Sequence, residues 1–311
     1  MANTYLMSIE ELALATKAEL IEGSARVEGF SSVSIDSRKA QDGSLFIALQ
    51  GTTQDGHDYV EAAFERGARV ALVSASQMQA RGPALRMIAE KHGSRLLVVK
   101  DTLLGLQMAA GAYLEKFPSL IRIGITGSSG KTTTKEIAAA MIGIEKKVVM
   151  NEGNLNSETG LPLSVFTIRD EHELGIFEMG MNRKGEMAEL AAVLRPQIAL
   201  ITNIGTAHIG ILGSREQIAL EKKAIFSQFS GPELALIPED DAFAEYLASG
   251  LAGRVQKYGK KSLVDFNSSK SLGLEGTEII WAGKLVSPPA REPYLSMPLC
   301  RCYSKSCLLF G

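Results

Sequence analysis

The chain has 311 residues, of which 45% are hydrophobic and 22% charged, and its formal net charge is −2. This composition is typical of a globular protein with a sizeable core, and the length suggests two or three domains. The near-neutral charge excludes the strongly basic surface of nucleic-acid-binding proteins, and no apolar run is long enough to span a membrane. We therefore expect a cytoplasmic monomer that binds no nucleic acid and does not insert into a membrane.

The first 118 residues show the pattern of one α/β domain. The N-terminus resembles an amphipathic helix with acidic residues near its start, which argues against a signal peptide. Short apolar runs predict strands at 33–35, 45–48, 70–73 and 96–99, and helical patterns occur at 58–66 and 103–115. The last helical pattern ends at Pro118, so we place a domain boundary near this residue.

Residues 119–286 alternate regularly between apolar strands and helices. Strands are predicted at 121–126, 174–178, 198–203 and 234–237, and helices at 131–142, 184–194, 215–229 and 241–249. Near-continuous apolar strands that alternate with helices indicate a parallel sheet covered on both faces. From residue 254 the pattern changes to short strands and turns, in which "GTEIIWAGK" is typical of a hairpin arm. Residues 287–311 hold all three cysteines and four of the ten prolines, so we expect a tail there and no further domain.

Residues 124–136, "GITGSSGKTTTKE", follow a predicted strand and open a predicted helix, as a phosphate-binding loop does. The spacing differs from the common form G-x-x-x-x-G-K-[ST], because Ile125 stands where the first glycine should be. Backbone N–H groups at a helix N-terminus favour anions, Lys131 can reach the outer phosphates, and Thr132 can offer its hydroxyl to Mg²⁺. The alternative is a plain strand–turn–helix junction. We predict a nucleotide site formed by Gly127, Ser128, Ser129, Gly130, Lys131, Thr132 and Thr133.

Two further polar residues are expected at the same edge of the sheet as this loop. Glu178 ends one predicted strand, and His208 follows the next in "NIGTAHIG". Ligands of open α/β sheets lie beyond the carboxyl ends of the strands, so both residues and Thr132 could share magnesium ions. Taken singly, Glu178 could be a solvated strand end and His208 an ordinary loop histidine.

Lys222 lies on the apolar face of a predicted helix. In "REQIALEKKAIFSQF", its spacing places it in line with Ile218 and Ile225, whereas Lys223 is rotated away. A lysine in this position can simply extend its amine to solvent, which is the alternative to a role in the site.

The loop "TGSSGKTTT" resembles the T-G-x-x-G-K-[ST]-[ST] loop of the Mur ligase family and of the related folylpolyglutamate synthases. The resemblance explains the shifted glycine, and it implies ATP and Mg²⁺ as cofactors. It implies that Lys222 is carbamoylated, because the family places at this point a lysine whose anionic carbamate can bind magnesium. By the same resemblance the catalytic residues are Lys131, His208 and Lys222, and the metal ligands are Thr132, Glu178, His208 and the carbamate of Lys222.

The N-terminal segment "IDSRKAQDGSLFIALQGTTQDGHDYVEAAFERGA" resembles the uridine-nucleotide-binding domain shared by the MurE and MurF types of this family. The resemblance implies that Ser37 and Arg38 contact a UDP-sugar, through a hydroxyl and a guanidinium that binds the diphosphate. The alternative is a polar turn before a strand. We expect His57 to be structural or to lie at the rim of the site.

The central part favours the MurF type. "NEGNLNSETGLPLSV" resembles the substrate loop of that type, with Asn154, Asn156 and Ser157 as substrate contacts, and "FEMGMNRKGEM" and "TNIGTAHIGILGSREQIALEKKAIF" are also similar. The resemblance implies a ligase that uses ATP to join D-alanyl-D-alanine to UDP-N-acetylmuramoyl-tripeptide through an acyl phosphate. A MurE-type ligase that adds one amino acid, and a nucleotide-binding protein without turnover, are the alternatives.

The resemblance extends from about residue 25 to about residue 285. Members of the family continue with an "HN-x-x-N"-like stretch that helps to hold adenine and with a Rossmann-like domain for the amine substrate, and this sequence shows neither. We therefore expect an N-terminal UDP-sugar-binding domain over 1–118 and a central parallel-sheet ATPase domain over 119–286, without the C-terminal domain. A truncated or frame-altered gene product with little or no activity would explain the difference, and a short family member with a new tail is the alternative.

Overall fold

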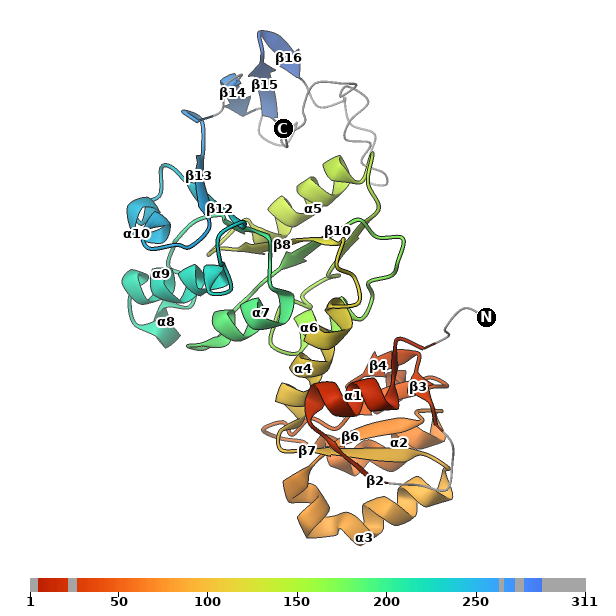
Figure 1. Ribbon diagram of the computed structural model, residues 1–311. Coiled ribbons are helices and arrows are strands. Elements are labelled where there is room, and N and C mark those ends of the chain that lie inside the picture. Colours follow the sequence, from red (N-terminus) through yellow and green to blue (C-terminus); the bar gives the residue numbers. More distant parts are fainter. Residues whose placement is uncertain (1–4, 22–26, 263–265, 272–276, 287–311) are drawn as a thin grey trace.

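The computed structural model describes residues 5–21, 27–262, 266–271 and 277–286 (Figure 1). The chain forms an N-terminal and a central α/β part, each built on one sheet with helices packed against it. Helix α4 (Thr102–Leu114) lies between the two parts. Helix α4 packs against helices of both parts, namely α1 (Ile9–Thr16), α6 (Gly160–Val165) and α7 (Glu186–Leu194). The predicted cysteine-containing tail lies outside the described residues. No helix of the described ranges is both long enough and apolar enough to span a bilayer.

The N-terminal sheet has five strands in the order β2-β7-β6-β5-β4. The strands are β2 (Glu19–Ile21), β4 (Ser32–Ser34), β5 (Ser44–Ile47), β6 (Val70–Ser74) and β7 (Arg95–Val99). Strands β4 to β7 are parallel, and β2 pairs antiparallel with β7. A separate pair is formed by β1 (Met7–Ser8) and β3 (Gly29–Phe30), and short 3₁₀ turns are η1 (Ser37–Lys39) and η2 (Gly56–Tyr59).

Alternation along the strands explains why this sheet is covered on both sides. On β5, Leu45 and Ile47 point into the core shared with α1 and α4, whereas Phe46 points to the opposite face. That opposite face is covered by α2 (Val60–Glu65) and α3 (Ala75–Lys91). The four predicted strands are confirmed, and so is the helix at 103–115.

Helix α3 was not predicted, and its sequence shows why. It contains Pro83 in its interior and a non-helical residue at Arg81, with φ of −140° and ψ of 24°. Proline removes a backbone donor and disfavours helix at the preceding residues, so the apolar period is broken. Only Gly82, Leu85 and Ala89 of this helix are buried, and its packing against the sheet compensates for a weak local signal.

The central sheet has six parallel strands in the order β13-β12-β11-β8-β10-β9. They are β8 (Ile121–Thr126), β9 (Val148–Met150), β10 (Leu174–Glu178), β11 (Ile198–Ile201), β12 (Leu234–Pro238) and β13 (Arg254–Tyr258). Helix α5 (Lys131–Ile142) packs on one face, and the other face is covered by α6, α7, α9 (Arg215–Lys223) and η3 (Ala224–Phe226). The short helices α8 (Ile209–Leu212) and α10 (Ala244–Ala248) complete this part.

The predicted parallel sheet covered on both faces is confirmed. The bounds of β8, α5 and β10 agree with the prediction, β11 ends two residues early, and the helix at 215–229 is divided into α9 and η3. Strand β9 and helices α6 and α8 were not predicted, because each has only three to six residues. The hairpin arm is confirmed as β15 (Thr277–Trp281) and β16 (Lys284–Val286), which form an antiparallel sheet with β14 (Phe266–Ser271).

The order of the central strands places a topological switch at β8. The next strands along the chain, β9 and β10, lie on one side of β8, whereas β11, β12 and β13 lie on the other. Chain connections leave such a strand in opposite directions, and ligands of open α/β sheets bind in the crevice that results. The glycine-rich loop follows β8 directly.

Candidate nucleotide and metal site

The loop between β8 and α5 needs glycine at two positions. Gly127 has φ of 152° and Gly130, which caps α5, has φ of 76°. A Cβ atom on Gly127 would lie 1.8 Å from Oγ1 of Thr202, so no side chain fits there. The close approach brings the loop against the end of β11 and leaves backbone N–H groups at the N-terminus of α5.

Two residues after β11 hold the loop in this shape. The Asn203 carbonyl accepts a hydrogen bond of 3.0 Å from Ser128 N, and its side-chain Oδ1 accepts one of 3.2 Å from Ser129 N. The Thr202 hydroxyl donates to the Ser129 carbonyl over 2.6 Å. Sequence reasoning did not identify Thr202 and Asn203, because the contacts depend on the pairing of β8 with β11.

Lys131 and Thr132 start α5 at the edge of the loop. Lys131 donates from Nζ to the Gly127 carbonyl over 3.1 Å, so its charge lies above the loop. Thr132 donates from its hydroxyl to Oε2 of Glu178 over 2.6 Å. Thr133, the next residue of α5, is exposed to solvent. The predicted nearness of Thr132 and Glu178 is confirmed.

Glu178 is a buried carboxylate at the carboxyl end of β10, with only 3% of its surface exposed. Its Oε1 accepts a hydrogen bond of 2.7 Å from Nδ2 of Asn156. A buried carboxylate needs hydrogen-bond partners or a cation. Carboxylate and hydroxyl oxygens are ligands that suit Mg²⁺, so Thr132 and Glu178 fit the predicted metal.

Lys222 and His208 bring two further basic groups to the same site as Lys131. Lys222 is 1% exposed, and burial together with the Lys131 cation lowers its pKa to about 7, against a smaller opposite effect of Glu221. The pKa of His208 is also lowered, by burial and then by the Lys222 and Lys131 cations. In the described part of the chain, the amine of Lys222 has no hydrogen-bond or ion-pair partner. Three basic side chains thus meet where an anion would relieve their repulsion.

His208 reaches this position through an unusual backbone conformation. Its φ is 66° and its ψ 16°, in the left-handed region, directly before α8. Few non-glycine residues adopt this region, and such residues are frequent at functional sites. Thr132 follows β8, Glu178 ends β10 and His208 follows β11, and these three strands are neighbours in the sheet. This agrees with the expectation that the three residues lie at one edge of the sheet.

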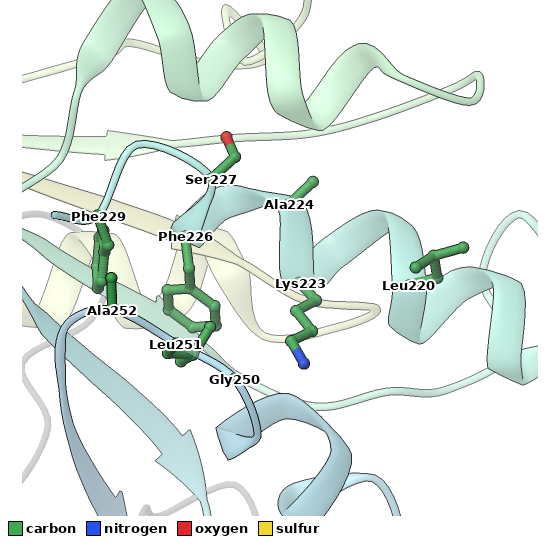
Figure 2. A pocket seen from close by; sticks show the side chains of 9 residues that line it. All are labelled: Leu220, Lys223, Ala224, Phe226, Ser227, Phe229, Gly250, Leu251 and Ala252. Carbon is green, nitrogen blue, oxygen red and sulfur yellow. The ribbon is translucent and has the colours of Figure 1, made fainter.

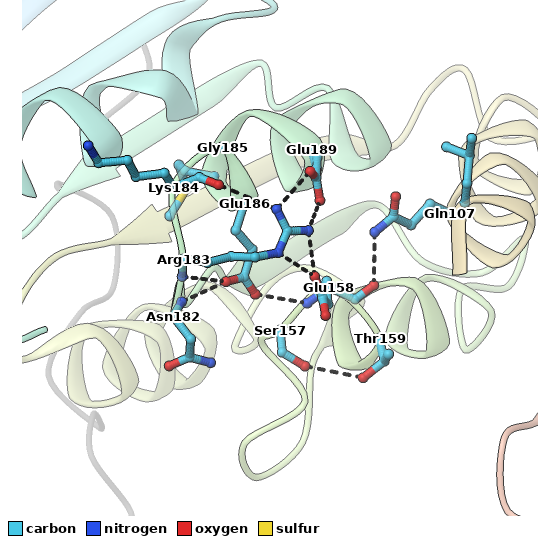
Figure 3. Close-up of polar contacts among 12 residues, drawn as sticks. Gln107, Ser157, Glu158, Thr159, Asn182, Arg183, Lys184, Gly185, Glu186 and Glu189 are labelled. Carbon is cyan, nitrogen blue, oxygen red and sulfur yellow. Dashed lines mark hydrogen bonds and ion pairs between the residues drawn. The ribbon is translucent and has the colours of Figure 1, made fainter. Parts of the chain in front are cut away.

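The predicted substrate loop is held to its surroundings by a polar network (Figure 3). The buried carboxylate of Glu186, at the start of α7, accepts backbone hydrogen bonds from Asn182, Arg183 and Glu158. The Arg183 guanidinium contacts the carboxylates of Glu158 and Glu189. Gln107 of α4 donates to the Glu158 carbonyl over 3.2 Å, which connects the loop to the helix between the two sheets.

The three predicted substrate contacts of this loop differ in their surroundings. Asn154 is exposed, whereas the Asn156 side chain donates a hydrogen bond to the Glu178 carboxylate. The Ser157 hydroxyl lies 3.3 Å from that of Thr159 and accepts a hydrogen bond from Gly160 N. Glu221, which precedes Lys222 in α9, accepts hydrogen bonds from Gly185 N and Met187 N. These bonds connect α9 to the start of α7.

Ser37 and Arg38 lie on η1 in the N-terminal part, and among the described residues no hydrogen bond or ion pair joins them to the phosphate loop. Ser37 is buried, whereas Arg38 is exposed and forms a two-point contact with Asp36, from Nε over 2.9 Å and from Nη2 over 2.8 Å. These hydrogen bonds lower the pKa of Asp36 to about 2. An exposed guanidinium is free to exchange this partner for a diphosphate.

His57 is structural, as expected. The ring is buried, its Nε2 accepts a hydrogen bond of 2.9 Å from Ser74 N, and its Nδ1 lies 2.6 Å from Oδ1 of Asp55. The Ser74 contact requires an unprotonated Nε2, so Nδ1 carries the proton and donates to the carboxylate. Both ring nitrogens are therefore occupied.

A pocket of about 370 Å³ lies between α9, η3 and the segment that follows α10 (Figure 2). Its lining is mainly apolar and includes Phe226, Phe229 and Leu251. Lys223 donates there to the carbonyls of Tyr246 and Ser249, over 2.7 Å each. None of the predicted site residues lines this pocket, so it is separate from the candidate nucleotide site.

Two protein-family models match the chain. The Mur ligase middle domain matches residues 125–296, and the domain described as the Mur ligase family catalytic domain matches residues 29–103. The first alone covers more than half of the chain.

The chain belongs to the Mur ligase family.

Several curated relatives are named UDP-N-acetylmuramoyl-tripeptide–D-alanyl-D-alanine ligase. The one from Treponema pallidum is 43% identical over 284 residues, which are 91% of this chain and 61% of that protein. The one from Bacillus subtilis is 39% identical over 220 residues, which are 71% of this chain and 46% of that protein. This Mur ligase family member thus spans about half to three fifths of the length of these relatives.

Solved structures of MurF show the same fold. A MurF crystal structure from Acinetobacter baumannii has a TM-score of 0.77 and 28% identity, and the match covers 91% of this chain and 59% of that one. MurF from Thermotoga maritima in complex with ADP has a TM-score of 0.68 and 26% identity, over 82% of this chain and 57% of that one. The expected Mur ligase fold is confirmed.

Proposed function

We propose that this chain contributes to an ATP-dependent ligase of the MurF type, which joins D-alanyl-D-alanine to UDP-N-acetylmuramoyl-tripeptide in peptidoglycan precursor synthesis. One observation carries the proposal: the phosphate loop, the Thr132–Glu178 pair and the buried Lys222 come together at the topological switch of the central sheet. The names of the similar proteins support this type of ligase and these substrates.

The proposed nucleotide site uses the N-terminus of α5. The loop residues Gly127 to Thr133 would bind the phosphates of ATP through backbone N–H groups, and Lys131 would neutralise charge on the outer phosphates. Thr132, Glu178, His208 and a carbamate on Lys222 would hold magnesium. A bound magnesium ion supplies charge neutralisation and alignment of the phosphates.

The proposed reaction has two steps. A carboxylate oxygen of the tripeptide attacks the γ-phosphorus of ATP, the bond to the bridging oxygen breaks, and ADP leaves. The amine of D-alanyl-D-alanine then attacks the acyl carbon, loses a proton, and inorganic phosphate leaves with the electron pair of the C–O bond. The chain contributes by holding the phosphates and excluding water, and no covalent intermediate with a side chain is needed.

The first step can be tested with the chain alone. Hydroxylamine converts an acyl phosphate into a hydroxamate, so incubation with ATP, Mg²⁺, UDP-N-acetylmuramoyl-tripeptide and hydroxylamine should give a hydroxamate that mass spectrometry detects. The trap needs no D-alanyl-D-alanine site. Absence of both hydroxamate and ADP, from a folded chain that binds both substrates, would contradict a catalytic role for it.

Lys222 should carry a carbamate when carbon dioxide is present. Its amine is buried and lacks an acceptor among the described residues, and its lowered pKa leaves a neutral amine near neutral pH, which is the form that attacks carbon dioxide. With ¹³C-labelled bicarbonate, we expect a carbamate signal by NMR that is lost in Lys222→Met.

Lys223→Met is the matched control for this prediction. Its amine already donates to two carbonyls and lies near the Tyr246 ring, so it should form no carbamate, and its replacement should leave the signal unchanged. A wild-type protein without a carbamate signal would remove Lys222 from the proposed metal ligands.

The N-terminal part, residues 1–118, is proposed to bind the uridine nucleotide, and residues 119–286 to bind ATP. Replacing Ser37 and Arg38 together with alanine should weaken binding of UDP-N-acetylmuramoyl-tripeptide by about 10- to 100-fold, because a charged hydrogen bond to the diphosphate is lost. Calorimetry measures the affinity, and ATP affinity should not change.

Arg69→Ala provides the control for the double replacement. Arg69 is also partly exposed and paired with an aspartate, Asp42, but it lies outside the proposed site. Its replacement should leave the affinity for the UDP-linked peptide unchanged. Equal affinities of the Ser37/Arg38 variant and the wild type would place the uridine site elsewhere.

A further inference from the structure

Helix α5 buries a lysine at a position where its packing calls for an apolar residue. The side chain of Lys135 is 0% exposed. Ala138 and Ala139, one turn further along, and Ile142, two turns further along, pack on the sheet. Burial of an ammonium is strongly unfavourable unless partners compensate for the lost water. A methionine or leucine would fill this position without that cost, so the fold alone does not explain the lysine.

The Lys135 amine has one buried partner and one at the surface. It donates over 2.6 Å to the backbone carbonyl of Asn151, which is also 0% exposed. It also lies 3.0 Å from Oε1 of Glu136, whose side chain is half-exposed. The short contact to a buried carbonyl is therefore the one that fixes Lys135 within the protein.

The Asn151 side chain forms hydrogen bonds with both the backbone N–H and the backbone carbonyl of Glu178. Its Oδ1 accepts a hydrogen bond of 2.9 Å from Glu178 N, and its Nδ2 donates to the Glu178 carbonyl over 3.0 Å. The ladder between β9 and β10 ends with Met150 paired to Ile176. The Asn151 side chain continues the pairing beyond the last backbone pair and fixes the tip of β10.

The same asparagine also shapes the loop that supplies the side-chain contact to Glu178. Its Nδ2 donates to the Leu155 carbonyl over 2.9 Å, directly before Asn156. Asn156 then donates to Oε1 of Glu178, while Thr132 donates to Oε2. Hydrogen bonds and the intervening covalent bonds thus connect Lys135 through Asn151 to the backbone of Glu178. They also connect it, through Leu155 and the adjoining Asn156, to the Glu178 carboxylate.

We propose that Lys135 and Asn151 are positioning residues that hold the Glu178 carboxylate in place for the magnesium–nucleotide complex; the inference rests on the metal role proposed for Glu178. Lys135 and Thr132 lie on the same helix, so the connection fixes Thr132 and Glu178 relative to each other. Residues that orient a metal ligand commonly affect metal affinity although they do not touch the metal.

The test compares ATP affinity in Mg²⁺ and in EDTA, measured by calorimetry on the full chain. For Lys135→Met, we expect the ratio of the two affinities to fall by about 10-fold, whereas the affinity in EDTA changes little. Methionine has a similar volume and removes a buried charge, so the variant should fold. A merely structural role would instead lower thermal stability and change both affinities equally.

Asn151→Ala should reduce the same ratio, and the double variant should lose no more than Asn151→Ala alone, because Lys135 acts through Asn151. The matched control is Glu136→Gln, which removes the surface partner of Lys135 and should leave the ratio within about 2-fold of wild type. Should Lys135→Met fail to fold, Asn151→Ala still decides the question.

Two results would overturn the inference by itself: a wild-type ratio in Lys135→Met or Asn151→Ala, or equal losses with and without magnesium. A wild-type chain that binds ATP equally well in Mg²⁺ and in EDTA would overturn the proposed metal role of Glu178, and this inference with it. The wild-type measurement therefore separates failure of the proposed function from failure of the positioning role.

Discussion

Replacing Lys131 with alanine is expected to weaken ATP binding by about 10- to 100-fold, the effect of losing a hydrogen bond to a charged group. The Lys131 amine lies over the phosphate loop, 3.1 Å from the Gly127 carbonyl, and its counterpart in the bound state would be the outer phosphates. The side chain is only partly buried, so the fold should survive the change. Calorimetry with ATP and with AMP measures the effect.

AMP makes the experiment specific, because it lacks the phosphates that Lys131 would reach. Its affinity should change little in Lys131→Ala, whereas that of ATP falls. Lys147→Ala is a suitable control, since Lys147 is an exposed lysine directly before β9 and outside the site. Unchanged ATP affinity in Lys131→Ala would show that the loop is only a structural junction between β8 and α5.

The central sheet could be predicted well because its strands are buried on both faces. Strands such as β8 and β10 are continuous apolar runs, and α5 begins directly after a glycine-rich loop, so sequence and structure agree to the residue there. The three-residue strand β9 carries too little pattern for a prediction. Helix α3 contains Pro83, which breaks the helical signal that its packing restores.

The candidate site could be predicted only in part, for a related reason. Glu178 and His208 could be found because Glu178 ends a recognisable strand, His208 follows another, and the carboxyl ends of parallel strands share one edge. Thr202, Asn151 and Lys135 act through hydrogen bonds with backbone atoms of other elements. Such contacts depend on the register of neighbouring strands, and the residue types alone do not reveal them.

Replacing Glu178 with glutamine should remove most of the magnesium dependence of ATP binding. Glutamine has the same shape and can still accept the hydrogen bond from Thr132, but it carries no negative charge for the cation. We expect the ratio of ATP affinities in Mg²⁺ and in EDTA to fall by about 100-fold, at the upper end of what is typical for residues that only support a metal ligand. Affinity in EDTA should stay the same or rise, because a negative charge near the phosphates is lost.

Glu173→Gln is the matched control, because Glu173 stands directly before the other end of the same strand and pairs with Lys146 at the surface. It removes an equal charge from the chain, so any long-range electrostatic effect on the nucleotide should appear in both variants. A loss that is confined to Glu178→Gln and to magnesium-containing buffer would therefore come from metal binding itself. Equal ratios in the two variants would instead mean that Thr132 and Glu178 form a structural pair, and the magnesium ligands would have to be sought among the remaining polar groups at the end of β11.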